Sequence, residues 1–363
     1  MTELSIRAVW GSGAPSGKLL RLALLPASAL YGAAVQLRNF LFTHGMLKSV
    51  RLPRPVVSVG NLTVGGTGKT PTCLWLAQEL TERGLKIAIL SRGYGRKEKR
   101  PVVLRPSDSA TTTINHDKRL REAGDEPLMM AEIYRQTVGI AANRAAAAAE
   151  LLRHQDVDLF LLDDGFQHRQ IQRDVDLLLL GQDSTGHLLP AGPFREPRGN
   201  LCRADFLITT GGEGSWAPAI ASENSAASFT ASLRPVALVG VSSDGAKEFP
   251  LTLLYRNKIL IVTGIADPRG LYRFIHEWEG EIVETLEFPD HHFYTARDWQ
   301  KISRLARLVD LIITSEKDIL KLSQFPFARD KLLALRVALE VENGAALVEA
   351  IVQKIGGARR PGA

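Results

Sequence analysis

Residues 55–71 of this 363-residue chain combine a β-branched run, a glycine-rich turn and the tripeptide Gly68-Lys69-Thr70. Glycines in such a turn let backbone N–H groups approach phosphate oxygens, and the N-terminus of the following helix adds a favourable dipole. In this P-loop layout Lys69 reaches the β- and γ-phosphates, while the Thr70 hydroxyl binds Mg²⁺. A glycine-rich turn with a chance Gly-Lys-Thr is the alternative. The stretch predicts a nucleoside triphosphate site formed by Thr63, Val64, Gly65, Gly66, Thr67, Gly68, Lys69 and Thr70.

A second chemical signal is the apolar run 158–162, which ends in Asp163 and Asp164. A strand ending in acids is the Walker B arrangement, which sets a carboxylate beside the magnesium of a P-loop. An acidic turn after a buried strand gives the same pattern without function. Because a P-loop precedes it, we favour the functional interpretation, with Asp163 and Thr70 as Mg²⁺ ligands.

Three further loops remain ambiguous from the residues alone. The segment 92–96 holds two arginines and a tyrosine after an expected strand, where open α/β sheets bind ligands, although a plain loop fits equally. Asp125 and Glu126, between a glycine and a proline, fit either a helix cap or a general base beside a metal ligand. The run 290–292, Asp-His-His, fits a carboxylate–imidazole relay, a metal site or ordinary structural histidines.

The composition bounds the class of protein. Hydrophobic residues make up 45% of the chain and charged residues 23%, which is typical of a folded protein. A formal net charge of +6 suits an anionic partner but does not choose between nucleotide, nucleic acid and membrane. The two cysteines, Cys73 and Cys202, form neither a metal motif nor a disulfide framework, which indicates the cytosol.

The N-terminal region is apolar and bordered by basic residues. No charged residue lies between Arg21 and Arg38, but Pro26 and Gly32 interrupt a stretch that falls short of a spanning helix. A helix at about 17–45 that lies on an anionic membrane is one interpretation. A helix packed on the protein core is the other.

Continuous apolar strands alternate with helical segments along the chain, which predicts an α/β fold with a mostly parallel sheet covered on both faces. We expect strands near 86–91, 158–163, 175–180, 205–210, 259–263, 311–315 and 332–337. Alternating segments near 229–241 and 251–255 predict a β-ribbon that links two domains. The expected domains are residues 1–225, with the P-loop, and a smaller α/β domain, residues 226–363.

Taken together and in order, these motifs resemble the tetraacyldisaccharide 4′-kinase family of the lipid A pathway. The matching stretches are 59–71, 91–96, 124–127, 163–168, 192–197, 264–268, 288–292 and 314–318, so the resemblance covers nearly the whole chain. Thr63, which departs from the general P-loop pattern, is what this family has at that position. The resemblance implies ATP- and Mg²⁺-dependent phosphorylation of the 4′-hydroxyl of a tetraacyldisaccharide 1-phosphate.

The resemblance also implies partners and a location. The expected partners are a lipid-linked disaccharide and the anionic inner-membrane surface, with no nucleic acid, and a monomer is expected. The protein would act at the cytosolic face of the bacterial inner membrane as a peripheral or monotopic protein, docked through its N-terminal helix.

The resemblance further implies residue roles. Asp125 becomes the catalytic base and His291 its partner across the domain interface, so that transfer requires domain closure. Lys69 meets charge on the transferred phosphoryl group, with Arg195 or Arg144 as further candidates, and Glu126 is a third candidate metal ligand. Candidates for contacting the sugar or phosphate are Arg92, Tyr94, Arg96, Arg144, Gln167, His168, Arg195 and Glu196.

Two alternatives belong to other classes. One is a nucleotide switch that recruits a partner, since residues 314–318, at the end of an expected strand, are similar to the guanine-reading motif of GTPases. Glu316 stands where that motif has asparagine. The other is a kinase of a soluble cofactor, which the N-terminal apolar helix disfavours.

Overall fold

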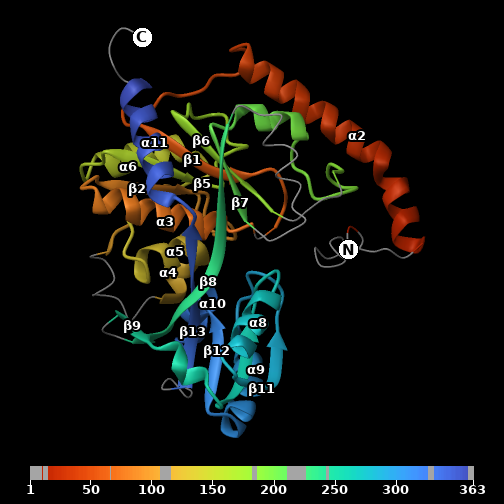
Figure 1. Cartoon of the computed structure of the whole chain (residues 1–363), viewed down its shortest axis with the longest axis vertical. Coiled ribbons are helices and arrows are strands. Elements are labelled where there is room, and N and C mark those ends of the chain that lie inside the picture. Colours follow the sequence, from red (N-terminus) through yellow and green to blue (C-terminus); the bar gives the residue numbers. More distant parts are fainter. Residues whose placement is uncertain are drawn as a thin grey trace. The chain divides into compact units, whose positions relative to one another are not determined.

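The computed structural model describes residues 10, 15–65, 67–106, 116–181, 186–210, 226–242, 245–325 and 331–358. The chain forms two compact units, each assembled from separated segments (Figure 1). Unit 1 comprises residues 1–85, 158–232 and 339–363, and unit 2 comprises residues 86–157 and 233–338. The division into consecutive domains at 225/226 stays a prediction.

Unit 1 is built on a parallel sheet with β1 at its centre. Strand β1 pairs with β5 on one side and β6 on the other, and the order continues through β7 to the first residues of β8, every pair being parallel. All residues of β1, β5 and β6 are buried, as expected for a sheet covered on both faces. The strands are β1 (Val56–Asn61), β5 (Leu159–Asp163), β6 (Val175–Leu180), β7 (Phe206–Thr210) and β8 (Ala227–Ser242).

Helix α3 (Lys69–Glu82) follows the P-loop directly and packs on β1 and β5. Its buried face consists of Thr72, Cys73, Leu74, Leu76, Ala77 and Leu80. The helix ends just before Gly84, which adopts a left-handed φ of +84°. Helix α11 (Gly344–Ala358) contacts α3 and β6, and a 3₁₀ helix, η2 (Arg198–Arg203), also belongs to the unit.

Helix α2 (Pro15–Thr43) is a single long helix of unit 1. It continues through Pro26 and Gly32, which the sequence predicted to interrupt it. Its stretch 16–43 is long and apolar enough to cross a membrane by length and composition, and only 11% of the most apolar window is buried. The prediction that this segment is too short to span a membrane is therefore wrong by the criterion of helix length. Orange-red α2 runs along the edge of unit 1 in Figure 1.

The first part of unit 2 is a small sheet covered by helices. Strand β2 pairs in parallel with β4, and β3 pairs with β4 antiparallel. Helix α6 packs on β2, β3 and β4, while α5 contacts α4. The elements are β2 (Ile87–Ser91), β3 (Val102–Leu104), β4 (Val138–Ile140), α4 (His116–Ala123), α5 (Asp125–Glu132) and α6 (Arg144–Leu152).

The second part of unit 2 contains parallel strands in the order β11, β10, β12, β13. Helix α10 packs on β12 and also on α5, which joins the two parts of the unit. Residues of α8 join strand residues in one core, which includes Leu254, Ile261, Ile275, Ile313 and Leu333. The elements are β10 (Lys258–Thr263), α8 (Arg269–Glu277), β11 (Glu281–Glu287), α9 (Ala296–Leu305), η4 (Ala306–Leu308), β12 (Leu311–Ser315), α10 (Glu316–Leu322) and β13 (Leu332–Val341).

One sequence prediction in this region needs correction, and one strand was missed. The segment 251–255 is not a strand, because Leu251–Leu254 forms the 3₁₀ helix η3, whose Leu251 and Leu254 enter the core. The antiparallel partner of β8 is instead β9 (Gly245–Phe249). Strand β11 was not predicted, and its mostly exposed side chains explain why its hydrophobic signal is weak.

Candidate active site

The P-loop of unit 1 is held in place by neighbouring loop and strand atoms. Thr63 is buried and forms an isolated bridge with Phe194, and the Val64 N–H donates to the Pro193 carbonyl at 2.8 Å. The side-chain amide of Asn61 donates to Thr67 Oγ1 at 2.7 Å. Thr63 therefore contributes a buried β-bridge. Gly66 lies outside the described residues.

Two glycines shape the cradle. Gly65 and Gly68 have φ values of +134° and +84°, which side-chain-bearing residues rarely adopt. Gly68 is the residue before the first turn of α3, so that turn's N–H groups lie at the end of the glycine-rich loop. Lys69 Nζ donates to the Gly65 carbonyl at 3.1 Å, across the mouth of this turn. The loop has the backbone and the cation that a polyphosphate needs.

The two acids after β5 take different positions. Asp163 is the buried last residue of β5, in register with Val59 of β1. Asp164 turns away with a φ of +50° and accepts from Arg195 Nη1 at 2.8 and 2.9 Å. Its Oδ1 also lies 3.9 Å from Lys69 Nζ. Arg195 and Lys69 thus both lie next to Asp164, whereas Asp163 belongs to the strand end.

The donor set of unit 1 fits a nucleotide-bound magnesium ion. Mg²⁺ prefers oxygen ligands and usually takes only one or two protein carboxylates, with phosphates and waters completing its shell. Asp163 at the strand end and Thr70 in the first turn of α3 offer such oxygens. Within the described ranges, no three His, Cys, Asp or Glu residues gather as a metal site. Glu126, the third candidate, belongs to unit 2, where its Oε1 lies 3.7 Å from Lys317 Nζ.

Gln167 links the acidic turn to the P-loop strand. Its Nε2 donates to the Asn61 carbonyl at 2.8 Å, and its Oε1 lies 3.4 Å from Arg195 Nη1. Its own carbonyl accepts from Arg38 of α2 at 2.6 Å. The N–H of His168, which is partly exposed, donates to the Gly165 carbonyl at 2.8 Å. The predicted residues Gln167, His168 and Arg195 therefore gather beside the P-loop strand.

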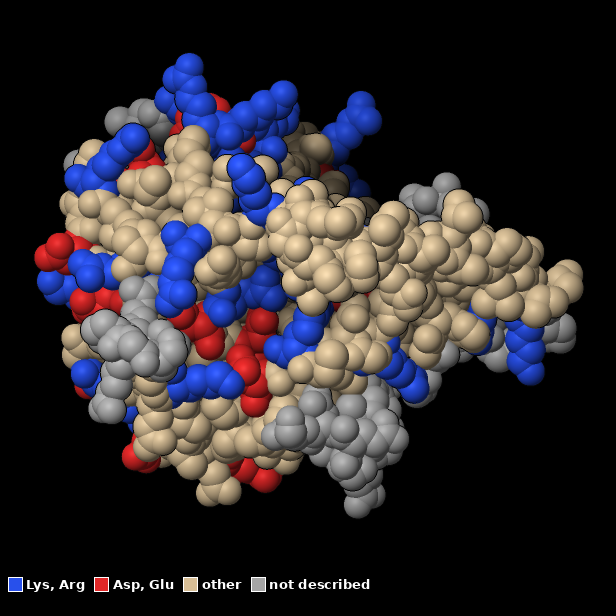
Figure 2. Space-filling model, turned by 90° about the horizontal axis from the view of Figure 1, so that it is seen from above, with Lys and Arg blue, Asp and Glu red and all other residues tan. Residues whose placement is uncertain are grey.

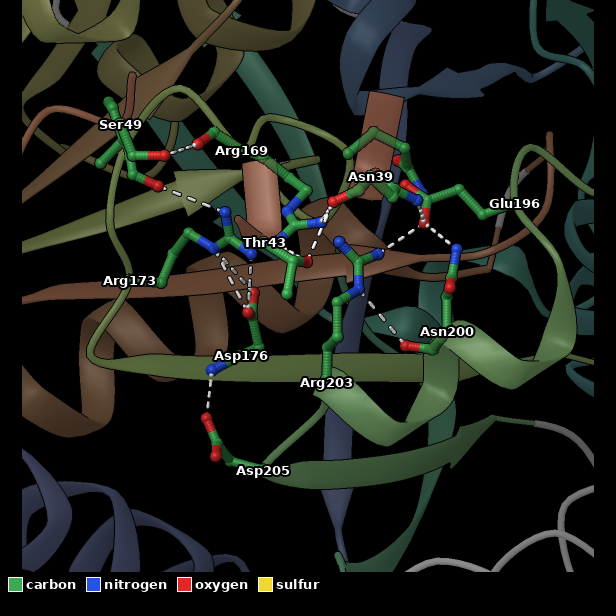
Figure 3. A network of polar contacts seen from close by, with 12 residues as sticks. Asn39, Thr43, Ser49, Arg169, Arg173, Asp176, Glu196, Asn200, Arg203 and Asp205 are labelled. Atoms are coloured by element: carbon green, nitrogen blue, oxygen red, sulfur yellow. Dashed lines mark hydrogen bonds and ion pairs between the residues drawn. The ribbon is translucent and has the colours of Figure 1, made fainter. Parts of the chain in front are cut away.

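Glu196 has a different environment from Arg195. It is 1% exposed, and its Oε2 accepts from Asn39 at 3.0 Å, Asn200 at 2.6 Å and Arg203 at 2.5 Å. Figure 3 shows this carboxylate between Asn39 of α2 and the donors of η2. Burial lowers the pKa of Arg203, while the charge of Glu196 acts in the opposite direction. Glu196 thus joins α2 to the body of unit 1.

The segment 92–96 belongs to unit 2. Arg92 and Tyr94 are exposed, whereas Arg96 Nη1 donates to the Ile140 carbonyl at 3.0 Å. The ring centroid of Tyr94 lies 4.9 Å from that of His291. Arg144, at the start of α6, is buried, and its Nη1 donates to the Ala142 carbonyl at 3.2 Å. Of these residues, Tyr94 is therefore the one that contacts His291.

Asp125 and His291 meet within unit 2. His291 Nδ1 lies 3.0 Å from each carboxylate oxygen of Asp125. Asp125 is the first residue of α5, and its Oδ1 also accepts from the Glu126 N–H at 3.0 Å. The N-cap of the helix is Gly124, so the two acids lie in the first turn, but the predicted side-chain cap is not formed. Gly124 precedes it with a φ of +88°, and a Cβ there would meet the Tyr94 carbonyl at 2.8 Å. We expected this pair to span a domain interface. In the structure both residues belong to unit 2 instead.

Two lysines of α10 lie near the Asp125–His291 pair. Lys321 Nζ lies 3.4 Å from Asp125 Oδ2, and Lys317 Nζ lies 2.9 Å from Asp290 Oδ1. Burial alone would raise the pKa of Asp125, but the His291 hydrogen bond and the charges of Lys317 and Lys321 lower it overall. For His291, burial acts to lower the pKa, yet the bond to Asp125 raises it above the ordinary value. The contact therefore favours the ionised form of Asp125 and the protonated form of His291.

The structure separates the neighbouring histidines and adds residues that the sequence did not single out. His292 Nε2 lies 3.1 Å from Asp298 Oδ2, an acid that caps α9, so His292 has a structural partner. Lys317 and Lys321 were missed as site residues, although Lys317 lies in the quoted segment 314–318. The buried Asp318 side chain accepts from the Gly264 N–H at 2.9 Å. That internal contact disfavours guanine reading by this segment.

Comparison with known proteins decides the family. Residues 20–356 match the family described as tetraacyldisaccharide-1-P 4'-kinase. The chain belongs to this kinase family. A tetraacyldisaccharide 4'-kinase from Syntrophus aciditrophicus is 36% identical over 342 residues, covering 87% of this chain and 89% of that protein. The corresponding enzyme from Haemophilus influenzae is 33% identical over 313 residues, covering 85% and 86%.

The fold agrees with this membership. The crystal structure of LpxK from Aquifex aeolicus in complex with ATP is 31% identical, with a TM-score of 0.73, covering 93% of this chain and 99% of that one. The predicted α/β fold with a P-loop and an N-terminal apolar helix is confirmed, as are the family and the kinase class. The roles predicted for individual residues of this tetraacyldisaccharide-1-P 4'-kinase family member stay predictions.

Proposed function

We propose that this chain transfers the γ-phosphate of ATP to the 4′-hydroxyl of a tetraacyldisaccharide 1-phosphate. The observation that carries the proposal is the cradle of Gly65, Gly68 and Lys69, in a chain that matches the kinase family over residues 20–356. The product would be the 4′-phosphorylated lipid A precursor. The monomeric state expected from the family resemblance is part of this proposal.

The donor half of the reaction uses residues of unit 1. The loop N–H groups and Lys69 would bind the phosphates, and Thr70 and Asp163 would hold the magnesium ion. The ion supplies charge stabilisation to the transferred phosphoryl group. Arg195 adds a second cation next to Lys69, because both contact Asp164. Arg144 and Glu126, which belong to unit 2, remain candidates for the phosphoryl charge and the metal respectively.

The acceptor half uses the Asp125–His291 pair of unit 2. A sugar hydroxyl keeps its proton until attack is well advanced, so a positioned carboxylate accepts that proton late. The lowered pKa of Asp125 keeps it ionised and ready to accept at neutral pH. His291 donates to the carboxylate and orients it. Tyr94 adjoins His291, and with Arg92, Arg96, Gln167 and His168 it is proposed to contact the disaccharide or its phosphate.

Helix α2 supplies the proposed membrane contact. Its exposed leucines include Leu19, Leu22, Leu30 and Leu37, which recur on one side of the helix at 3.6 residues per turn. Ser28, Tyr31 and Asn39, which bind other parts of unit 1, lie on the opposite side. In Figure 2, the projecting part where α2 lies is mostly tan, with blue basic residues along its margin. We therefore place the protein at the cytosolic face of the inner membrane, bound through this apolar stripe.

One assay tests the proposal. The protein is incubated with γ-labelled ATP, Mg²⁺ and the tetraacyldisaccharide 1-phosphate, and the lipid is then extracted and counted. We expect label in the lipid with the natural chain and with Lys86→Ala, which changes an exposed lysine paired with Asp156. Lys69→Ala should give little label. If ATP binds but no label reaches the lipid, the proposed acceptor is wrong.

A further inference from the structure

A closed circuit of contacts surrounds the Asp125–His291 pair. The backbone N–H of His291 donates to the Gly264 carbonyl at 3.2 Å, and the Gly264 N–H donates to Asp318 Oδ2 at 2.9 Å. Lys321 Nζ contacts Asp318 Oδ1 at 2.7 Å and Asp125 Oδ2 at 3.4 Å. The Asp125 carboxylate then returns to His291 Nδ1. Every member belongs to unit 2.

Lys321 occupies an unusual place for a lysine. It is 1% exposed and Asp318 is 0% exposed, although α10 is a helix of only seven residues. A buried ammonium is costly unless it is paired, and here it bridges two carboxylates. Asp318 accepts a hydrogen bond from Gly264 in the loop after β10, and Asp125 is the first residue of α5. Lys321 thus connects the loop that holds the His291 backbone to the carboxylate that the His291 side chain contacts.

The backbone of His291 needs this support. Its φ of +59° is left-handed, a conformation that costs free energy in a residue with a side chain and persists only when surrounding contacts hold it. Those contacts are the Gly264 carbonyl and Asp290 Oδ1, which accepts from the same N–H at 3.0 Å. Gly264 itself is tightly enclosed, since a Cβ there would lie 3.2 Å from the Pro289 carbonyl and 3.3 Å from Asp318 Oδ1. The loop and Asp318 are therefore closely fitted.

We infer that Lys321 is a positioning residue: by joining Asp318 to Asp125 it holds the Asp125 carboxylate and the His291 ring in their hydrogen-bonded arrangement. This role deepens the proposed kinase function and rests on it for its catalytic consequence. Lys321 touches neither the sugar nor the nucleotide in this role. It acts through Asp125.

A positioning role and a purely electrostatic role of Lys321 predict opposite changes in the His291 pKa when Lys321 is removed. If Lys321 acts only as a nearby cation, its removal raises the His291 pKa, because a repelling charge is lost while the Asp125 bond remains. If Lys321 holds the arrangement, its removal lets the pair separate, and the His291 pKa falls toward its ordinary value. The other charged or titratable groups near the ring come from several elements: Asp290 of the same loop, Lys317 of α10, Glu126 of α5 and Tyr94 after β2. They are unchanged in either case.

The test therefore follows the His291 ring by NMR. Histidine-labelled protein is titrated with pH as the natural chain, as Lys321→Met and as the double variant Lys321→Met/Asp318→Asn, with His291→Gln to assign the signal. The double variant removes both buried charges and keeps an oxygen that can accept from Gly264. It should therefore recover most of the stability that Lys321→Met loses by leaving Asp318 unpaired. Lys331→Met is the matched control, because Lys331 Nζ donates to the Val309 carbonyl at 2.7 Å within the same unit.

We expect the His291 pKa to fall in both Lys321 variants and to stay at the natural value in Lys331→Met. In the transfer assay, kcat should fall by about 10- to 100-fold in both, with KM for ATP unchanged, since misplacement of a catalytic group by about 1 Å can cost about 10²-fold. A higher or unchanged His291 pKa, or recovery of kcat in the folded double variant, would overturn the positioning role. A natural chain that transfers no phosphate would instead refute the proposed function, and the NMR result would still decide the role of Lys321.

Discussion

The imidazole of His291 lies 3.0 Å from both carboxylate oxygens of Asp125, although 166 positions separate the two residues along the chain. Asp125 opens helix α5, and His291 lies in the loop between β11 and α9. The contact lowers the pKa of Asp125 against the effect of burial and raises that of His291. The contact thus stabilises the ionised carboxylate and the protonated imidazole relative to their neutral forms.

Asp125→Asn should abolish most transfer without impairing nucleotide binding. An amide keeps the shape of the carboxylate but cannot accept the hydroxyl proton, so kcat should fall by about 10²- to 10⁴-fold. ATP affinity should persist, because the P-loop belongs to unit 1 and Asp125 to unit 2. The two quantities are measured by lipid labelling and by calorimetric titration of ATP. Turnover near that of the natural chain would exclude Asp125 as the base.

The stability contributed by His291 should depend on pH in a defined direction. A raised folded-state pKa means that the folded protein binds the proton more tightly than the unfolded chain. The contribution is therefore complete below the ordinary pKa of 6.5 and is lost as pH rises through the raised folded value. Urea unfolding of the natural chain and His291→Gln should differ most near pH 5.5 and less near pH 9. His276→Gln, at an exposed position of α8, is the control, and a difference that grows with pH would contradict the raised pKa of His291.

The sequence predicted the parts of the site that depend on local chemistry. The P-loop turn needs its glycines in order, and Asp163 follows an apolar strand, so both can be recognised from neighbouring residues. Buried strands such as β6 give continuous apolar runs, and β6 has the predicted bounds of 175–180. Strand β11 gave no such signal, because an exposed strand can contain glutamates. The segment 251–255 has apolar residues but forms a 3₁₀ helix, since Leu251 and Leu254 both pack into the core.

Contacts between distant segments could not be derived from residue patterns. The pairing of Asp125 with His291 was expected only from the family resemblance, and assigning the pair to one unit needed the structure. Lys321 follows two apolar residues of α10 and has the residue type of a solvated helix position. Its burial depends on Asp318, one turn earlier, and on Asp125 from α5. Glu196 was expected near substrate, yet its donors come from α2 and η2.

Lys69→Met should weaken ATP binding and transfer while leaving the fold unchanged. The methionine fills the space of the lysine stem but cannot meet phosphate charge, so kcat should fall by about 10²- to 10³-fold, as when one preorganised donor is removed. The backbone shape of the loop depends on Gly65 and Gly68 rather than on the ammonium. ATP titration and circular dichroism check the two parts of this expectation. Unchanged ATP affinity in a folded variant would place the phosphates elsewhere.

Glu196→Ala should destabilise the protein more than a surface change does. The substitution leaves Arg203 without its carboxylate and removes the acceptor for Asn39 of α2, and breaking a buried pair typically costs about 3–5 kcal/mol. Glu150→Ala, which breaks contacts of Glu150 with Arg153 and His154 on an exposed helix face, should cost only about 0.2–1 kcal/mol. Urea unfolding measures both. A fully stable Glu196→Ala protein with lost transfer would instead support the substrate role predicted from the sequence.

The apolar stripe of α2 gives the final prediction. The exposed side chains of Leu22, Leu30 and Leu37 project away from the face that binds unit 1, and Leu30 is 77% exposed. Replacing all three with glutamine should leave folding intact, because the contacts made by Ser28, Tyr31 and Asn39 remain. Burial of one leucine contributes about 1.5–3 kcal/mol, so sedimentation with anionic vesicles should weaken by at least about 10²-fold.

A matched control separates this stripe from general surface hydrophobicity. The double variant Leu253→Gln/Leu308→Gln changes two exposed leucines of unit 2, whereas α2 belongs to unit 1. This control should sediment with vesicles like the natural chain. Transfer to a detergent-dispersed acceptor should be retained in the α2 variant, because none of its substitutions alters the P-loop or the Asp125–His291 pair. Full vesicle binding by the α2 variant would show that the stripe is not the membrane contact, and the basic residues beside it would then be the surface to test.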